Sequence, residues 1–237
     1  MTIQSEASRL PAEWSTALRR RGCDVGRIEE LVASIYDGAA PGSVLPQRSD
    51  VFRAFHLTTL TDVRVVILGQ DPYPRPDQKA QGLAFSVPSG VEPPRSLKAI
   101  FSNLVRDPDV DFSWPATGDL TEWARRGVLL LNTALTVQAP VPDSHRARWT
   151  DFTDAVLSLV NDESDHVVFL LWGRRAIDRG TAIPIGDAHK VIRSAHPAAR
   201  GRSREQRFKD VRHFSQANAF LTAHHPEAVN WNIADRH

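Results

Sequence analysis

A buried strand that runs directly into a polar, proline-containing loop is the feature that most constrains this chain. Residues 63–68 form a short apolar run, interrupted only by Arg64, that is rich in β-branched side chains. Such a run suits a central parallel strand that is covered on both faces. Gly69 permits a tight exit, and Pro72 and Pro74 cannot donate to a sheet. The strand therefore ends in a stiff loop that carries the carboxylate of Asp71, at the place where open α/β sheets bind ligands.

Two further apolar runs have the same character and predict buried strands that begin near Val128 and Val167. Residues 189–194, centred on Val191 and Ile192, predict a fourth strand that begins near Val191. Several segments between them have the periodicity of amphipathic helices. These segments are residues 97–104, 119–126, 149–160 and, after the last strand, 206–222, while residues 11–36 form helices broken at Gly22. We therefore predict an α/β fold with three layers, α/β/α, around a central four-stranded, mostly parallel sheet.

Polar side chains follow three of these strands at the point where each strand ends. Asp71 follows the first strand, Asn132 the second, and His196 the fourth. Because the carboxyl ends of parallel strands meet at one edge of a sheet, we expect these side chains to converge on one pocket. Taken singly, each could instead be structural, as a helix cap, a partner of local backbone groups or a turn residue.

Length and composition limit the alternatives. A chain of 237 residues can form one large α/β domain, so we predict a single domain over residues 1–237, with residues 1–10 as a loose tail. The formal net charge is only +1, so a nucleic-acid contact would need a local basic patch. One cysteine, Cys23, allows neither an internal disulfide nor a cysteine-rich zinc or iron–sulfur site.

The chain has no apolar run that approaches membrane-spanning length, and its amino terminus has no signal-peptide core. The single cysteine agrees with a reducing compartment. We therefore expect a soluble, cytoplasmic protein with no membrane partner.

The loop after the first strand resembles the signature of family 1 uracil-DNA glycosylases. Residues 69–74 read GQDPYP and residues 81–87 read QGLAFSV. In that family the Asp positions or activates the attacking water, the Tyr closes the base pocket against the thymine methyl, and the Phe stacks on uracil. The resemblance assigns these roles to Asp71, Tyr73 and Phe85. It implies a monomeric enzyme that hydrolyses the N-glycosidic bond of uracil in DNA after base flipping, without a metal or redox cofactor.

Two later motifs extend the resemblance, which spans about residues 10–233. LLLNTALTV, beginning at residue 129, resembles the strand whose Asn reads the base, so it assigns base reading to Asn132. A side-chain amide can donate to O4 of uracil and accept from N3–H, an order that cytosine reverses. His196-Pro197 resembles the start of the family's HPSPL motif, which implies that His196 stabilises the leaving base, together with backbone N–H groups near Gln70.

The resemblance also assigns contacts with the DNA backbone. Pro94 and Ser96 belong to a proline-rich loop that in the family ends in Ser and presses on DNA, and a helix start offers N–H groups to a phosphate. Gly173 and Arg174 stand where many members have Gly-Ser. Arg174 could donate to phosphate or be a solvated residue at a helix start.

The chain departs from the family at its last motif, because residues 196–200 read HPAAR instead of HPSPL. Ala198 replaces the Ser that contacts phosphate, and Arg200 replaces the Leu that wedges into the helix stack. Arg200 could wedge by stacking its planar guanidinium, or could be solvated like the rest of a basic loop that includes Arg202. Pro74 stands where many members have His and receives no role.

Two alternatives stay open beside the enzyme. The altered loop would suit a glycosylase-fold protein that binds DNA or uracil-DNA with little turnover. An unrelated α/β hydrolase or nucleotide-binding enzyme is disfavoured, because the chain has no G-x-S-x-G elbow, P-loop or Rossmann glycine string. The partners that the resemblance implies are uracil-containing DNA, single- or double-stranded, and an inhibitor protein known for the family.

Overall fold

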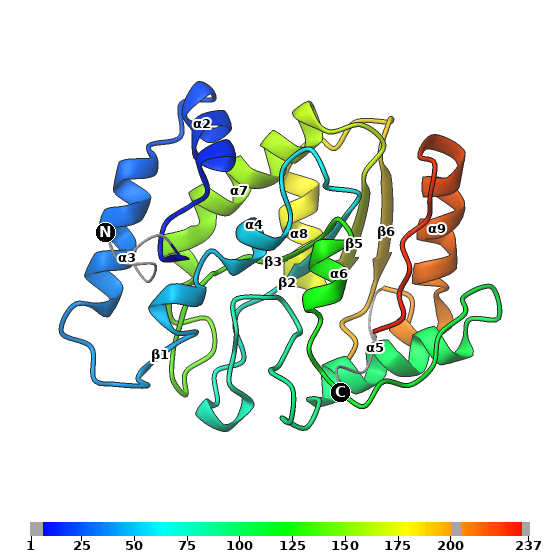
Figure 1. The fold of residues 1–237 in the computed structure, drawn as a ribbon, viewed down its shortest axis with the longest axis horizontal. Helices are drawn as coiled ribbons and strands as arrows, with labels where there is room; N and C mark the ends of the chain where they lie inside the picture. The colour runs from blue at the N-terminus through cyan, green and yellow to red at the C-terminus, as the bar shows by residue number, and fades with distance from the viewer. Residues whose placement is uncertain (1–6, 201–204, 234–237) are drawn as a thin grey trace.

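The centre of the computed structural model, which describes residues 7–200 and 205–233, is a parallel sheet of four strands in the order β3-β2-β5-β6 (Figure 1). Each adjacent pair of strands is parallel. The strands span Val65–Gly69 (β2), Val128–Asn132 (β3), Val168–Trp172 (β5) and Lys190–Ser194 (β6). The predicted four-stranded α/β sheet is confirmed, and its strands begin within two residues of the predicted positions.

Burial along the strands follows their place in the sheet. The strands β2, β3 and β5 are buried at every residue, as their unbroken apolar sequence predicts. The edge strand β6 instead exposes Lys190 and Arg193, and charged side chains on an edge oppose unwanted pairing. The other edge, β3, is covered, since Ala84 N–H donates to Leu130 O at 3.0 Å and helix α6 (Thr121–Arg125) packs against the strand.

Helices complete the layers, with α7 and α8 on one side of the sheet and α9 on the other (Figure 1). The α-helices span Ala12–Arg20 (α2), Val25–Tyr36 (α3), Arg53–Leu57 (α4), Arg95–Arg106 (α5), Thr121–Arg125 (α6), Arg146–Glu163 (α7), Arg174–Ala182 (α8) and His213–His224 (α9). Short 3-10 helices span Arg48–Asp50 (η1), Pro76–Gln78 (η2) and Phe208–Asp210 (η3). Together these elements bear out the predicted three-layer arrangement.

The last helix begins later than the prediction of residue 206. Residues Phe208–Asp210 form η3 instead, and α9 starts at His213. The side chain of Phe208 is buried, with its ring 5.1 Å from that of Trp172 and 4.5 Å from that of His213. This packing turns the chain inward before the helix can begin.

Two other features were not predicted from the sequence. Strands Val44–Leu45 (β1) and Val137–Gln138 (β4) pair antiparallel in a separate two-stranded sheet. Leu10, which we placed at the end of a loose tail, is buried in the core. Neither β1 nor β4 is long enough to show a periodic pattern, so only their pairing identifies them.

No helix in the described part of the chain is long and apolar enough to cross a membrane.

Candidate active site

A pocket of about 240 Å³ lies at the carboxyl edge of the sheet. Its lining includes Asp71 from the loop after β2, Asn132 from the end of β3 and His196 from the loop after β6. The fold therefore brings together the three strand-end residues that were expected to converge. The lining also includes four other residues that the sequence singled out, namely Gln70, Tyr73, Phe85 and Ser96.

The base of the pocket is formed where β2 and β3 end side by side. Gly69 pairs in register with Asn132, and a Cβ atom at position 69 would lie only 2.2 Å from Asn132 Oδ1. The glycine therefore leaves the space that the amide occupies. Thr133 fastens the following loop, because its N–H donates to Gly69 O at 3.0 Å and its hydroxyl to Gln70 O at 2.6 Å.

The Asp71 carboxylate is held by the loop that contains Asp143. Its Oδ2 accepts the backbone N–H of Asp143 at 2.7 Å. Asp143 has the left-handed φ of 62° and forms an ion pair with Arg175 of α8. Burial raises the pKa of Asp71, as does the Asp143 charge, while the Asp143 N–H and Arg175 oppose that rise. Neither Asp143 nor Arg175 was predicted from the sequence, since no motif links these two positions.

Phe85 has a strained backbone, which is uncommon for a bulky residue. Its φ is 65°, and it is buried with its ring 5.6 Å from the ring of Trp172 and 6.0 Å from that of His196. A left-handed conformation of this kind costs roughly 1–3 kcal/mol and persists only where the surroundings impose it, often at functional sites. The Tyr73 hydroxyl donates to Phe85 O at 3.1 Å, which helps to hold this conformation.

Ser96, for which we predicted a contact with the DNA backbone, has a buried hydroxyl group that bonds within the protein. Ser96 is 6% exposed, and its Oγ lies 2.8 Å from the Tyr73 hydroxyl. Helix α5 begins at Arg95, one residue earlier, which turns Ser96 inward in the first helical turn. Burial raises the pKa of Tyr73, so its hydroxyl stays protonated and able to donate.

His196 is placed as a neutral hydrogen-bond donor. Its Nδ1 accepts the backbone N–H of Ala198 at 3.1 Å, so a neutral imidazole carries its proton on Nε2. Burial lowers the pKa of His196 and so favours this neutral form. Gly173 leaves room for the backbone and Cβ of His196, because its φ is 89° and a Cβ atom there would lie 2.8 Å from His196 Cβ.

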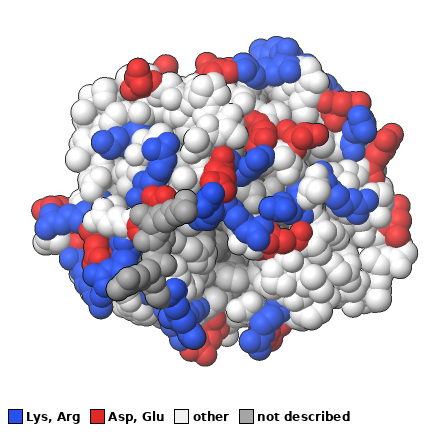
Figure 2. All heavy atoms as spheres, turned by 180° about the vertical axis from the view of Figure 1, so that it is seen from behind, with Lys and Arg blue, Asp and Glu red and all other residues white. Residues whose placement is uncertain are grey.

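Pro94, Arg174 and Arg200, which were also expected to contact DNA, do not line the pocket. Pro94 precedes the first residue of α5, and Arg174 begins α8, where its Nε lies 2.9 Å from Asp178 Oδ1 in an exposed ion pair. Arg200 is exposed, and Arg202 lies outside the described residues. Acidic and basic side chains are interspersed on the face seen in Figure 2, in keeping with the small net charge.

The described residues contain no group of three His, Cys, Asp or Glu side chains that could hold a metal ion.

Fold and site together define an α/β protein with a small pocket that combines a carboxylate, an amide, an imidazole and an aromatic ring. The model of the Uracil DNA glycosylase superfamily matches residues 55–222, which is most of the chain. The chain therefore belongs to the uracil-DNA glycosylase superfamily, and the resemblance seen in its motifs is confirmed.

Curated relatives named uracil-DNA glycosylase extend this match. The protein of Campylobacter curvus is 40% identical, and the match covers 98% of both chains. The protein of Erwinia tasmaniensis is 47% identical, with 81% of this chain and 83% of that protein covered.

Solved structures show the same fold at lower identity. Mimivirus uracil-DNA glycosylase is 24% identical, with a TM-score of 0.83 over 96% of this chain and 89% of that one. A variant of the mimivirus protein in complex with UGI has a TM-score of 0.83 at 23% identity, over 96% of this chain and 90% of that one.

Proposed function

We propose that this protein is a uracil-DNA glycosylase, which hydrolyses the N-glycosidic bond of a flipped-out deoxyuridine, releases uracil and leaves an abasic site. The convergence of Asp71, Asn132 and His196 on one pocket, beside Phe85, carries the proposal. The proposal includes uracil-containing DNA as partner, a monomeric state and a cytoplasmic location, in keeping with the single cysteine.

Breaking the glycosidic bond develops positive charge on the sugar and negative charge on the base. The Asp71 carboxylate suits the first charge, and it can also orient the attacking water. Because Oδ2 is held by the Asp143 N–H, the carboxylate has a fixed direction, and Oδ1 is the oxygen that would accept from the water. The mechanism needs the ionised form of Asp71, which gives its raised pKa a direct consequence for activity.

His196 suits the second charge. With its proton on Nε2, a neutral imidazole can donate one hydrogen bond to O2 of the departing uracil. A donor that is already oriented needs no rearrangement as the charge develops. We assign a supporting part to backbone N–H groups near Gln70, which lines the same pocket.

Base choice follows from three other pocket residues. The Asn132 amide would bind O4 and N3–H of uracil, and Phe85 would stack on the ring. Tyr73 would occupy the space beside C5, where thymine carries a methyl group. Its hydroxyl is tied to Phe85 O and Ser96 Oγ, so the ring has two anchors that resist displacement by a larger base.

Uracil release provides the direct test of this function. The intact protein is incubated with single-stranded and duplex oligonucleotides that contain one uracil, and free uracil and abasic sites are quantified. Matched oligonucleotides with thymine or cytosine at the same position are the controls. Stoichiometric binding without release of uracil would favour the alternative of a binding protein over an enzyme.

Substitutions in the pocket should change which base is removed. We expect Tyr73→Ala to gain thymine excision, because the space beside C5 opens. Asn132→Asp should gain cytosine excision, because a carboxylate accepts from the cytosine amino group. The latter variant should lose about 100-fold or more of its preference for uracil over cytosine, as expected for a site that reads polar groups.

These gains are measured as single-turnover release from oligonucleotides that carry each base. Asn132→Leu is the matched control for Asn132→Asp, since it removes polar recognition and should lose uracil excision without gaining cytosine. Failure of both Tyr73→Ala and Asn132→Asp to remove any new base would contradict the pocket assignment.

We propose that the exposed Arg200 is the wedge residue, which fills the gap that the flipped base leaves in the duplex. Arg200→Ala should reduce activity on duplex uracil about tenfold more than on single-stranded uracil, because extrusion from a duplex requires extra unpairing and unstacking. Arg200→Leu should restore part of the duplex activity while lowering the salt dependence of binding by about one counterion. The measurement is the ratio of duplex to single-strand activity across a salt series.

Arg19→Ala, which removes an exposed arginine of α2, controls for the loss of one positive charge. The ratio should be unchanged in this variant. An equally unchanged ratio in Arg200→Ala would show that Arg200 is a solvated loop residue.

A further inference from the structure

We propose that Gln81 is a positioning residue that holds the base-stacking Phe85 in place through the segment that joins them. The inference rests on the proposed function, because it assigns Phe85 to the flipped base. Gln81 does not line the pocket, and no role was predicted for it from the sequence.

The amide of Gln81 is buried and bonded in both directions. Gln81 is only 4% exposed. Nε2 donates to Ser86 Oγ at 2.6 Å and to Asp119 Oδ1 at 3.1 Å, while Oε1 accepts from Arg53 Nη1 at 3.0 Å. Both amide hydrogens and the amide oxygen therefore have partners, and the amide has one preferred orientation.

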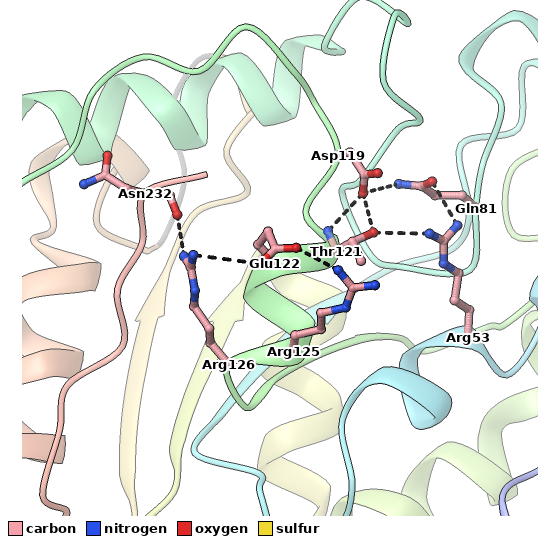
Figure 3. Close-up of polar contacts among 8 residues, drawn as sticks. All are labelled: Arg53, Gln81, Asp119, Thr121, Glu122, Arg125, Arg126 and Asn232. Carbon is pink, nitrogen blue, oxygen red and sulfur yellow. Dashed lines mark hydrogen bonds and ion pairs between the residues drawn. The ribbon is translucent and has the colours of Figure 1, made fainter. Parts of the chain in front are cut away.

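The groups around Gln81 reinforce that orientation. Figure 3 shows Arg53, Gln81, Asp119 and Thr121 as one connected group. Arg53 also donates to Thr121 Oγ1 at 3.2 Å, and Asp119 Oδ1 accepts the Thr121 N–H at 2.9 Å. A cation thus faces the amide oxygen and an anion faces the amide nitrogen, which a reversed amide could not satisfy.

The bond from Gln81 to Ser86 closes the segment that contains Phe85. Ser86 is itself fixed, because its Oγ accepts the Leu120 N–H at 2.9 Å. At the other end of the segment, Gly82 packs so closely that a Cβ atom there would lie 1.8 Å from Asp50 O. Phe85 therefore sits between two anchored ends, which is the kind of surrounding that can impose its φ of 65°.

Loss of the Gln81 amide should increase the mobility of the segment that contains Phe85, without changing the contacts of Asp71 and His196. Asp71 and His196 come from the loops after β2 and β6, and neither bonds to the Arg53–Gln81–Asp119 group through the contacts described above. The expected defect is therefore weaker stacking of the base and less accurate placement of the glycosidic bond. Binding of DNA that contains no uracil should be unchanged, because that binding does not fill the pocket.

Two substitutions test whether the hydrogen bonds of the Gln81 amide hold Phe85 in place. Gln81→Leu removes all three bonds at nearly constant size. Gln81→Glu can keep an acceptor for Arg53 but places a second carboxylate where Ser86 and Asp119 need a donor. Without these bonds the backbone of Phe85 can relax from its left-handed conformation, and the bound form must then restore it. The free energy of that conformation corresponds to about tenfold in affinity, so each variant should bind free uracil about tenfold more weakly.

Arg126→Gln is the matched control, because Arg126 directly follows α6, the helix that begins at Thr121, and bonds to the C-terminal segment on the other side of the group in Figure 3. Arg126 donates to Asn230 O at 2.8 Å and to Asn232 O. This variant loses two hydrogen bonds to backbone carbonyl groups that have no link to the Phe85 segment. It should lower the melting temperature but leave uracil affinity within about twofold of the native value.

The experiment measures four quantities for each protein: affinity for free uracil, single-turnover uracil release at saturating DNA, affinity for uracil-free duplex DNA, and melting temperature. Both Gln81 variants should lose about 10–100-fold in release, as for a slightly misplaced substrate, with uracil-free DNA binding unchanged. If Gln81→Leu does not fold, Arg53→Met removes one of the three bonds and should give a smaller loss of uracil affinity in the same direction.

Uracil affinity and release that match the native protein, or that fall only as far as in Arg126→Gln at equal melting temperature, would overturn the positioning role. That outcome is distinct from failure of the proposed function, in which the native protein itself would release no uracil.

Discussion

Asp71→Asn is expected to lower single-turnover uracil release by about 10²–10⁴-fold, the range typical of a positioned acid–base group. Asn has nearly the same shape as Asp, and its Oδ1 can still accept the Asp143 N–H. The variant loses the negative charge that would stabilise the cationic sugar and orient the water. Binding of uracil-containing DNA should be kept, since removing a carboxylate near the phosphates does not weaken their attraction.

This prediction is checked by measuring release and equilibrium binding on the same oligonucleotide. Asp77→Asn is the matched control, because Asp77 is an exposed carboxylate in the turn η2 that follows the same loop. The control should release uracil at the native rate. Near-native release by Asp71→Asn would remove Asp71 from the mechanism.

The pH dependence of uracil release provides a second test of Asp71. Burial raises the pKa of Asp71 above the usual range of a carboxyl group, so release should fall with falling pH through that raised value. Arg175→Gln removes a cation that lowers this pKa, and it should move the acidic limb to higher pH.

The sign for stability is opposite. Because the folded pKa of Asp71 is above its unfolded pKa, the carboxyl group favours folding most in its protonated form, below the unfolded pKa, and this advantage is lost as the pH rises through the folded pKa. At neutral pH, Asp71→Asn should therefore melt slightly above the native protein, as expected where a site carries a destabilising charge for function.

The second large effect is expected for His196→Ala, which should lower single-turnover release by about 10²–10³-fold, as for the loss of one donor to a developing anion. Binding of uracil-DNA should weaken far less, because the hydrogen bond strengthens only as the base acquires charge. Burial lowers the pKa of His196, so the imidazole is neutral, and release by the native protein should show no fall as the pH rises through 6.5, the usual pKa of histidine.

Two variants sharpen this test. His196→Gln keeps an N–H donor and should recover part of the lost rate, whereas His56→Ala removes a histidine outside the pocket and should have no effect on release. Equal losses in binding and release for His196→Ala would argue against selective stabilisation of the departing base.

The parts of the structure that the sequence predicted are those encoded by local patterns. Apolar runs identified three strands of the main sheet, and a shorter apolar pair between charged residues identified the edge strand β6. The rule that parallel strands end at one edge placed Asp71, Asn132 and His196 together. Each inference needed only the character of a segment and the polar residue that follows it.

Features that depend on contacts between distant residues were beyond that reasoning. The Asp143–Arg175 ion pair next to Asp71 joins a loop to helix α8, and the bond from Gln81 to Asp119 joins residues 38 positions apart. The left-handed φ of Phe85 is imposed by its surroundings rather than by its residue type. Ser96 turned inward for a related reason, since the exact first residue of a helix decides which way its early side chains point.

The contact between Gly69 and Asn132 has a consequence for how this protein can evolve. A side chain at position 69 would occupy the space of the Asn132 amide oxygen, so almost every mutation there should disturb the base reading that we propose for Asn132, whatever its polarity. A shorter residue at position 132 would make room for alanine at position 69, but only by giving up the amide. The two positions are therefore epistatic, and a lineage that alters its preferred base through position 132 also changes which residues position 69 tolerates.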